Sequence, residues 1–232
     1  MPSGKNSVAT ASVERLVLWM ESAHRVLVIT GAGMSADSGV PTYRGVGGLY
    51  EGAGTEDGIP IERALSGEML LTNPELCWKY IAQIEKGCRG AQPNAGHYAL
   101  AALEHSGRDC WILTQNVDGL HQAAGSQKVM SIHGDVHQLE CTACEYAVRV
   151  PDYAALTLPP SCPECGHLVR PRVVLFGESL PYGVVHQLHT QLALGFDLIL
   201  SIGTTSVFPY IQGPVLQAAS IGARTVEINM GH

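Results

Sequence analysis

Two Cys-x-x-Cys pairs constrain the fold of this 232-residue chain more than any other feature. Cys141 and Cys144 form the first pair, and Cys162 and Cys165 form the second after a gap of 17 residues. Each pair makes a tight turn that directs two thiolates to one point, so two pairs complete a closed tetrahedral shell of sulfur. The spacing predicts a structural zinc ribbon, in which the metal stabilises a fold without taking part in a reaction. The alternative is two redox pairs or two disulfides.

The composition is that of a compact globular protein. Charged residues make up 15% of the chain and apolar residues 46%, which argues against a disordered chain. The net charge of −7 gives no overall basic footprint, so we expect no direct nucleic-acid partner. No apolar run approaches the roughly 20 residues that span a bilayer, and residues 1–11 lack the apolar core of a signal peptide. We therefore expect a soluble, cytoplasmic protein without a membrane partner.

Short apolar segments alternate with helical patterns along the chain. Residues 25–30 form a continuous apolar run rich in β-branched residues, which is typical of a buried parallel strand. Further strand-like runs cover residues 110–114, 173–176, 197–202 and 224–228. Helical patterns cover residues 12–22, 61–69, 94–105, 181–194 and 213–220, and another begins at Pro74. The alternation predicts an α/β fold: a doubly wound, parallel, Rossmann-like sheet with a smaller lobe formed by helices and the zinc ribbon.

The same patterns predict where elements begin and how the chain divides. Ser12 is the predicted N-cap of the first helix, and residues 1–10 are predicted to form a loose arm. The Gly-rich, aperiodic segment 45–58 predicts a long loop. We expect a nucleotide-binding domain of residues 1–45, 91–138 and 169–232, and a small domain of residues 46–90 and 139–168.

A glycine pattern follows the first predicted strand directly. Gly31 and Gly33, with Ala36 three residues further on, would let backbone N–H groups approach a pyrophosphate closely. Dehydrogenases of this fold carry an acidic residue about 20 residues later, at the end of a second strand. Here residues 45–54 contain no strand pattern, and Glu51 lies in a glycine loop. The sequence predicts a bound dinucleotide without the architecture for hydride transfer.

Polar side chains follow two other apolar runs. Gln115, Asn116 and Asp118 come directly after residues 110–114 and offer groups suited to a ribose or a carboxamide. An Asx-type helix cap would explain one of these residues but not all three. His133 also ends a short apolar run, where a histidine is either a general base near neutral pH or a structural residue.

In this order, the motifs resemble those of the sirtuins, the NAD-dependent protein deacylases. The resemblance runs along nearly the whole chain. It is carried by residues 31–44, 114–118, 133–134, 176–178, 203–206 and 228–229, together with the two cysteine pairs. The first motif and the loop 45–48 are closest to the prokaryotic and mitochondrial desuccinylase-like branch.

The resemblance implies a role for each matching residue. The residues implied to bind NAD are Gly31, Ala32, Gly33, Asp37, Ser38, Tyr43, Arg44, Gln115, Asn116, Asp118, Gly203, Thr204, Ser206 and Asn229. His133 is the implied general base, and Asn116 is implied to be catalytic as well. An acyl-lysine peptide would add as a β-strand. The residues implied to contact it are Val174, Phe176, Gly177, Glu178 and Val207.

The implied reaction removes an acyl group, with acetyl as the expected one, from a protein lysine. It releases nicotinamide and O-acyl-ADP-ribose. A protein mono-ADP-ribosyltransferase is the alternative enzyme, although such an enzyme has less need of His133. A non-enzymatic module that binds NAD or a partner through its zinc ribbon is the alternative outside catalysis, and the complete set of polar residues argues against it.

Two places depart from the resemblance. The desuccinylase-like branch carries a Tyr-x-x-Arg motif in a small-lobe helix, and by spacing this chain has Ile81 and Ile84 there. Hydrocarbon at both positions predicts a pocket for acetyl and longer neutral acyl groups rather than for a carboxylate. If both are core residues instead, Arg63 or Arg89 could serve the pocket. Tyr210 stands where the family has a small residue.

Overall fold

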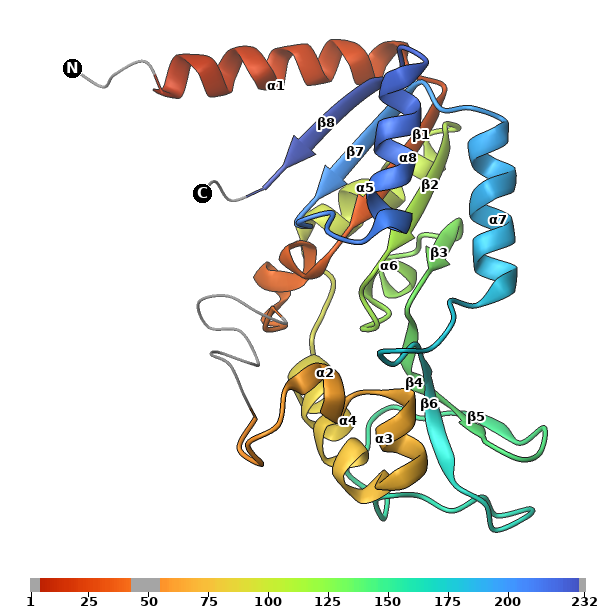
Figure 1. The fold of residues 1–232 in the computed structure, drawn as a ribbon. Helices are drawn as coiled ribbons and strands as arrows, with labels where there is room; N and C mark the ends of the chain where they lie inside the picture. Colours follow the sequence, from red (N-terminus) through yellow and green to blue (C-terminus); the bar gives the residue numbers. More distant parts are fainter. Residues whose placement is uncertain (1–4, 43–54, 230–232) are drawn as a thin grey trace.

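The computed structural model describes residues 5–42 and 55–229, with residues 5–11 described through their backbone alone. A parallel five-stranded sheet in the order β3-β2-β1-β7-β8 forms the larger lobe (Figure 1). Its strands are β1 (Arg25–Thr30), β2 (Asp109–Thr114), β3 (Val129–Ser131), β7 (Leu198–Ile202) and β8 (Arg224–Ile228). The predicted doubly wound parallel sheet is confirmed.

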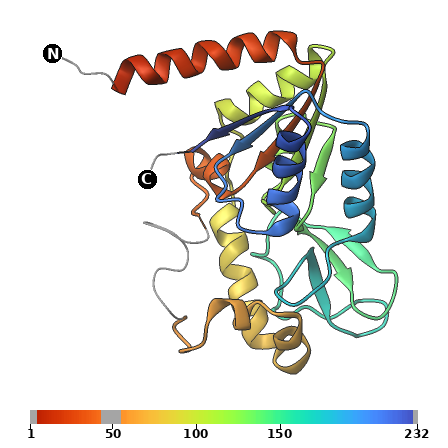
Figure 2. The same cartoon turned by 45° about the horizontal axis from the view of Figure 1, so that its top comes forward.

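Both faces of the sheet are apolar because successive residues of a strand point to opposite sides. Val26 and Val28 of β1 pack in a core with residues of α1 (Lys5–Ser22) and α5 (Ala95–His105). Leu27 and Ile29 pack on the other face with residues of α7 (Tyr182–Ala193) and α8 (Pro209–Ser220). Figure 2 shows the sheet between these helices. This explains why the strands read as continuous apolar runs.

The smaller lobe joins a second sheet to three helices (Figure 1). The sheet is antiparallel, with the strand order β5-β4-β6. Its strands are β4 (Gly134–Cys141), β5 (Ala147–Arg149) and β6 (Val169–Val173). The helices are α2 (Ile61–Ala64), α3 (Gly67–Thr72) and α4 (Pro74–Cys88). Their shared core includes Trp78, Tyr80 and Leu139 together with Cys141 and Cys162.

The prediction of a parallel strand at residues 173–176 is wrong. The strand there, β6, ends at Val173 and pairs antiparallel with β4 in the small lobe. A four-residue apolar run shows no periodicity that could indicate which sheet it joins. The fifth strand of the large sheet is instead β3, which lies at one edge and whose three residues are too few for a pattern. Residues 134–138 and 169–173 thus form strands of the second sheet, and the division into two domains stays a prediction.

The predicted helices differ from the structure at three places, one of which is α8, which begins at Pro209 rather than at residue 213. α1 begins at Lys5, so Ser12 lies inside the helix rather than at its N-cap, and residues 5–10 are helical rather than part of a loose arm. Ala9 and Ala11 favour this continuation because alanine has the highest helix propensity. The helical pattern of residues 61–69 is divided between α2 and α3, because Ser66 pairs with Phe176 as an isolated bridge.

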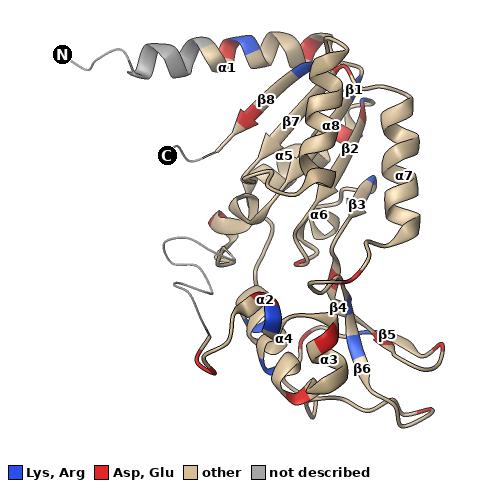
Figure 3. Cartoon of the chain, viewed as in Figure 1, with Lys and Arg blue, Asp and Glu red and all other residues tan. Residues whose placement is uncertain are grey.

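The remaining helical elements lie at the ends of the central strands. They are the 3-10 helix η1 (Ala32–Ser38) after β1 and the short helix α6 (Leu120–Ala123) after β2. Figure 3 shows Lys and Arg dispersed over both lobes. Within residues 5–42 and 55–229, no helix combines the length and the hydropathy that crossing a membrane requires.

Candidate active site

The strand order places a ligand site between β1 and β7. From β1 the chain adds β2 and β3 on one side and later β7 and β8 on the other, and ligands of such sheets bind at the carboxyl ends of the strands where the order reverses (Figure 1). Gly31 and Gly33 follow β1, and Gly203 follows β7. The backbone N–H of Gly33 donates to the carbonyl of Gly203 at 2.9 Å. A Cβ on Gly203 would lie 2.3 Å from the Met34 nitrogen, so only glycine permits this approach.

The helix η1 carries four of the predicted NAD contacts, Ala32, Gly33, Asp37 and Ser38. Asp37 is exposed, whereas Ala32 and Ser38 are half-buried. The Ser38 Oγ atom is buried and has no hydrogen-bond partner among the described residues. A buried hydroxyl of this kind is normally satisfied, so its position fits contact with a cofactor oxygen. Tyr43 and Arg44 lie outside the described residues.

The polar residues after β2 are joined to η1 by hydrogen bonds. The Asn116 side-chain amide donates to the Gly31 carbonyl and to Ser35 Oγ, both at 3.0 Å. Ser35 Oγ in turn donates to Asp118 Oδ2 at 2.7 Å. Ser35 is buried, and no sequence pattern distinguishes it from the other residues of the segment 31–38. The network holds Asn116 and Asp118 in fixed positions beside the glycine turn.

The residues predicted for the adenosine side also meet. Thr204 Oγ1 accepts from the Gln115 side-chain amide at 2.8 Å and from the Ser206 backbone N–H at 3.1 Å. The Asn229 side-chain amide donates to the Thr204 carbonyl at 2.9 Å. Ser206 has a φ of 50°, in the left-handed region that non-glycine residues seldom adopt. The segments that follow β1, β2, β7 and β8 thus converge on the carboxyl edge of the sheet.

His133 follows β3 and reaches the same edge. Its Nδ1 lies 3.0 Å from the Gln115 carbonyl oxygen, and its Nε2 lies 2.7 Å from the Tyr210 hydroxyl. A carbonyl can only accept, so Nδ1 carries the hydrogen and the neutral ring has its lone pair on Nε2. Burial lowers the pKa of His133 from its ordinary value. The side chain is therefore neutral near pH 7, as a general base must be.

A buried polar chain lies beneath this site. The Thr30 hydroxyl donates to the Thr114 hydroxyl at 2.8 Å and lies 3.0 Å from His121 Nε2. The His97 ring packs against the His121 ring with centroids 4.8 Å apart. Burial, reinforced by His97, lowers the pKa of His121 to about 3. Neither histidine was selected from the sequence, because α5 and α6 bring them together only in the folded chain.

The predicted peptide-binding turn lies between the two lobes. The Val174 backbone N–H donates to the His133 carbonyl at 3.0 Å, so this turn is attached directly to the segment of the catalytic candidate. Phe176 pairs with the other side of the small lobe through its backbone, accepting from the Gly67 N–H at 3.1 Å and donating to the Leu65 carbonyl at 2.9 Å. Val207, in the loop between β7 and α8, is 73% exposed.

Glu178 has a structural partner within this turn. Its carboxylate accepts from both terminal nitrogens of Arg170, at 2.5 and 2.9 Å, and from the Leu175 backbone N–H at 2.8 Å. Such a paired arrangement fixes geometry as well as adding energy. Glu178 therefore orders the turn through its side chain, and Gly177 next to it is exposed.

The two isoleucines predicted to select the acyl group lie on α4. Ile81 is 2% exposed and belongs to the small-lobe core, whereas Ile84 is half-buried at the margin of that core. Arg89 is ion-paired with the buried Glu85, and Arg63 is exposed. A role of either isoleucine in substrate binding stays a prediction.

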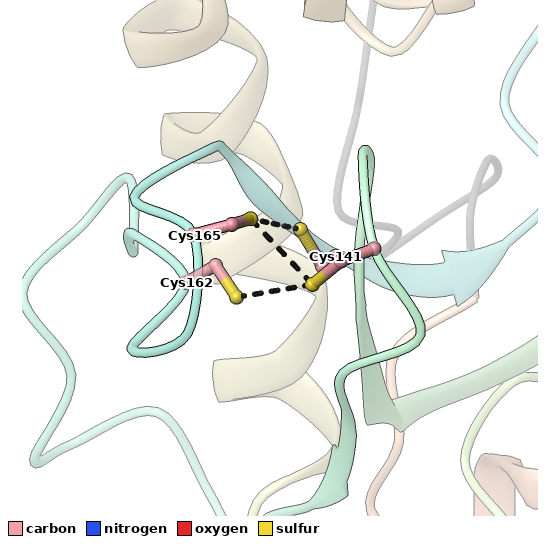
Figure 4. A group of neighbouring side chains, drawn as sticks. Cys141, Cys162 and Cys165 are labelled. Carbon is pink, nitrogen blue, oxygen red and sulfur yellow. Dashed lines mark hydrogen bonds between the residues drawn. The ribbon is translucent and has the colours of Figure 1, made fainter.

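The four cysteine sulfurs converge on one point (Figure 4). All four lie within 4.8 Å of one another, and three of their separations are 3.4, 3.5 and 3.6 Å. Zinc–sulfur bonds of about 2.3 Å in a tetrahedron place sulfurs about 3.8 Å apart. The Ala143 backbone N–H also donates to Cys141 Sγ at 3.3 Å. The cluster fits one structural zinc ion.

The fold and the site define a class of protein: a nucleotide-binding α/β protein with a zinc ribbon and a neutral histidine near the carboxyl edge of its parallel sheet. Residues 31–209 match the model of the Sir2 family. The chain is 54% identical over 213 residues to "NAD-dependent protein deacylase 2" of Pseudomonas syringae pv. tomato, covering 90% of this chain and 86% of the relative. The chain belongs to the Sir2 family.

Solved structures agree with this assignment. A Sir2 homologue in complex with NAD is 34% identical and superimposes with a TM-score of 0.82, covering 93% of this chain and 82% of the homologue. A Sir2 protein with a p53 peptide and NAD+ is 28% identical, with a TM-score of 0.80, and the match covers 95% of this chain and 87% of that protein. The resemblance seen in the sequence motifs is confirmed at the level of the family and the fold.

Proposed function

We propose that this protein is an NAD-dependent protein-lysine deacylase that removes acetyl and other neutral acyl groups, with release of nicotinamide and O-acyl-ADP-ribose. The observation that carries the proposal is the neutral His133 ring, fixed by Gln115 beside the network of Asn116, Ser35 and Asp118. The family assignment and the deacylase names of the relatives support it. A cytoplasmic location stays a prediction.

The chain offers a place for each part of NAD. Gly31 and Gly33 would admit the pyrophosphate to the backbone, Gln115, Asn116 and Asp118 would hold the nicotinamide ribose and carboxamide, and the Thr204 region would face the adenosine. NAD supplies a ribose carbon from which nicotinamide can leave. His133 acts by accepting a proton at Nε2, the nitrogen that carries its lone pair.

The acyl-lysine peptide would bind as an extended strand between residues 175–178 and the loop containing Val207. Backbone pairing in this mode binds many sequences with low selectivity. The ion pair of Arg170 with Glu178 supports such binding by ordering the turn before a peptide arrives. The lysine side chain would then enter between the lobes toward His133.

One assay tests the proposal against both alternatives. The protein is incubated with NAD and an acetylated peptide, and the products are identified by mass. A deacylase yields nicotinamide and O-acetyl-ADP-ribose, a transferase yields a protein or peptide carrying ADP-ribose, and a binding module yields neither.

Replacing His133 tests its role as the general base. His133→Ala should lower turnover by about 10²-fold or more while NAD binding, measured by calorimetry, is retained. His189→Ala, on the exposed side of α7, is the control and should keep wild-type turnover. Turnover of the His133→Ala protein close to wild type would remove His133 from the mechanism.

A further inference from the structure

Tyr210 is in direct contact with the proposed base. Its hydroxyl lies 2.7 Å from His133 Nε2, and the two rings meet edge to face with centroids 5.8 Å apart. Phe208 stacks on Tyr210 at 5.3 Å and also meets the His133 ring edge to face at 6.0 Å. The three rings form a cluster that joins the loop before α8 to the segment after β3.

The hydrogen bonds of the imidazole determine what Tyr210 does there. Nδ1 donates to the Gln115 carbonyl, which leaves one lone pair on the ring, at Nε2. The Tyr210 hydroxyl is a donor of suitable geometry at that lone pair. A neutral imidazole nitrogen has a single in-plane lone pair, so a second hydroxyl can donate to Nε2 only if Tyr210 leaves it.

The segment that holds Tyr210 can accommodate such a departure. Tyr210 is half-buried in the first turn of α8, and Phe208 before it is 40% exposed. Upstream, Ser206 has a φ of 50° and Gly203 a φ of 60°. A non-glycine residue in the left-handed region is held there only by its surroundings, and such residues are frequent where segments move.

We infer that Tyr210 competes with ligand hydroxyls for the Nε2 atom of His133, so that a ribose can engage the base only by displacing the Tyr210 hydroxyl. The inference rests on the proposed function for the identity of the ligand, which is the ribose of an ADP-ribose moiety. Its chemical basis is one acceptor nitrogen shared by two donors. Tyr210 is thereby a residue that controls access to His133.

The titratable side chain that contacts the His133 ring is Tyr210 itself, and the contacts from Gln115 and Phe208 are uncharged. A ribose hydroxyl can therefore replace the Tyr210 hydroxyl at His133 Nε2 without a change in the charge of any of these groups. It is broken by Tyr210→Phe, which removes the hydroxyl and keeps the stacked ring.

Calorimetric binding of ADP-ribose at pH 7.5 tests the inference without turnover. Tyr210→Phe should bind ADP-ribose about threefold to tenfold more tightly than the wild type, because one hydrogen bond no longer has to be exchanged. Tyr182→Phe, a tyrosine of α7 that is 82% exposed, is the control and should bind as the wild type does. Thermal unfolding of both variants confirms that they are folded.

A second measurement reports directly on the hydrogen bonding of His133 Nε2. Long-range ¹H–¹⁵N NMR correlations of His133 should show the Nε2 resonance of the wild-type protein shift on addition of ADP-ribose, and Tyr210→Phe should shift it before any ligand is added. Equal or weaker ADP-ribose binding by Tyr210→Phe would overturn the competition and assign Tyr210 a contact with the ligand instead. A wild-type protein that binds neither ADP-ribose nor NAD would overturn the proposed function itself.

Discussion

The large sheet and the small lobe bury their apolar residues in different ways. In β1, Val26 and Leu27 are both fully buried, one in the core against α1 and α5 and the other in the core against α7 and α8. The small lobe has one core, and two of the predicted zinc ligands, Cys141 and Cys162, belong to it. Apolar burial on two faces can stabilise the sheet by itself, whereas the small lobe closes its core with metal ligands.

The largest expected effect comes from removing the metal, which should unfold the small lobe while the large sheet stays folded. Structural zinc contributes on the order of 10 kcal/mol to isolated zinc modules. Cys144→Ala should lose zinc by elemental analysis, lose solubility and activity, and lose hydrogen-exchange protection in β4 and β6. Protection in β1 and β2 should persist, because their cores contain none of the four metal ligands.

The control for this variant is a cysteine of the other lobe. Cys110→Ala removes a buried thiol from β2 and should keep one zinc per chain together with protected β4 and β6. A purified, active wild-type protein without metal would contradict the zinc assignment. Loss of protection throughout both lobes in Cys144→Ala would contradict their independence.

The second effect concerns the glycine contact within the large sheet. In Gly203→Ala the new Cβ would lie 2.3 Å from the Met34 nitrogen, so the turns after β1 and β7 must separate. Overpacking of this kind costs about 1–3 kcal/mol, and NAD binding should weaken about tenfold or more in calorimetry.

Gly195→Ala is the matched control because Gly195 also has a positive φ, of 78°, but no atom within 4 Å of its added Cβ. Both variants carry the left-handed strain of about 1–2 kcal/mol. NAD affinity that falls equally in both would mean that strain, rather than the close approach, explains the loss.

The third effect concerns the acyl pocket predicted at α4. With Ile81 and Ile84 on α4, an unpaired succinyl carboxylate would be costly to bury. We expect kcat/KM for acetyl-lysine to exceed that for succinyl-lysine on the same peptide by at least about tenfold, or roughly 1.4 kcal/mol. Equal or better desuccinylation would contradict the assignment of these two positions.

An added arginine sharpens this prediction. Ile84→Arg should narrow the preference for acetyl, because a guanidinium matches a carboxylate. Gln83→Arg places the same charge on the neighbouring position, where the native side chain points to Glu56, and should leave the preference unchanged.

The smallest effect is a pH dependence of the large lobe. The pKa of His121 is about 3 in the folded protein, below the ordinary value of about 6.5 expected for the unfolded chain. As the pH falls below about 6.5 the unfolded state binds the proton first, so the contribution of His121 to stability is present above that pH and is lost on acidification.

Urea unfolding at pH 7.5 and 5.5 measures this dependence. The free energy of unfolding of the wild type should fall by about 1 kcal/mol more than that of His121→Gln over this interval. The exposed His189→Gln should behave as the wild type does. An identical loss in His121→Gln and wild type would exclude His121 as the titrating group.

The sequence by itself determined the features that depend on residues close to one another along the chain. The spacing of Cys141, Cys144, Cys162 and Cys165 predicted one metal cluster, because each tight turn is a local structure. The apolar runs at β1, β2, β7 and β8 predicted a parallel sheet, because strands buried on both faces need continuous hydrocarbon. The polar residues after these strands were found because parallel strands end at one edge.

Only the tertiary structure decided which distant residues meet. Residues 173–176 do not form a strand of the parallel sheet, because β6 ends at Val173 and pairs with β4. Ser35 joins Asn116 to Asp118, and Tyr210 reaches His133 across 77 positions of the chain. No local pattern contains these pairs, because side-chain hydrogen bonds between distant segments depend on how whole elements pack and not on the propensity of any one segment.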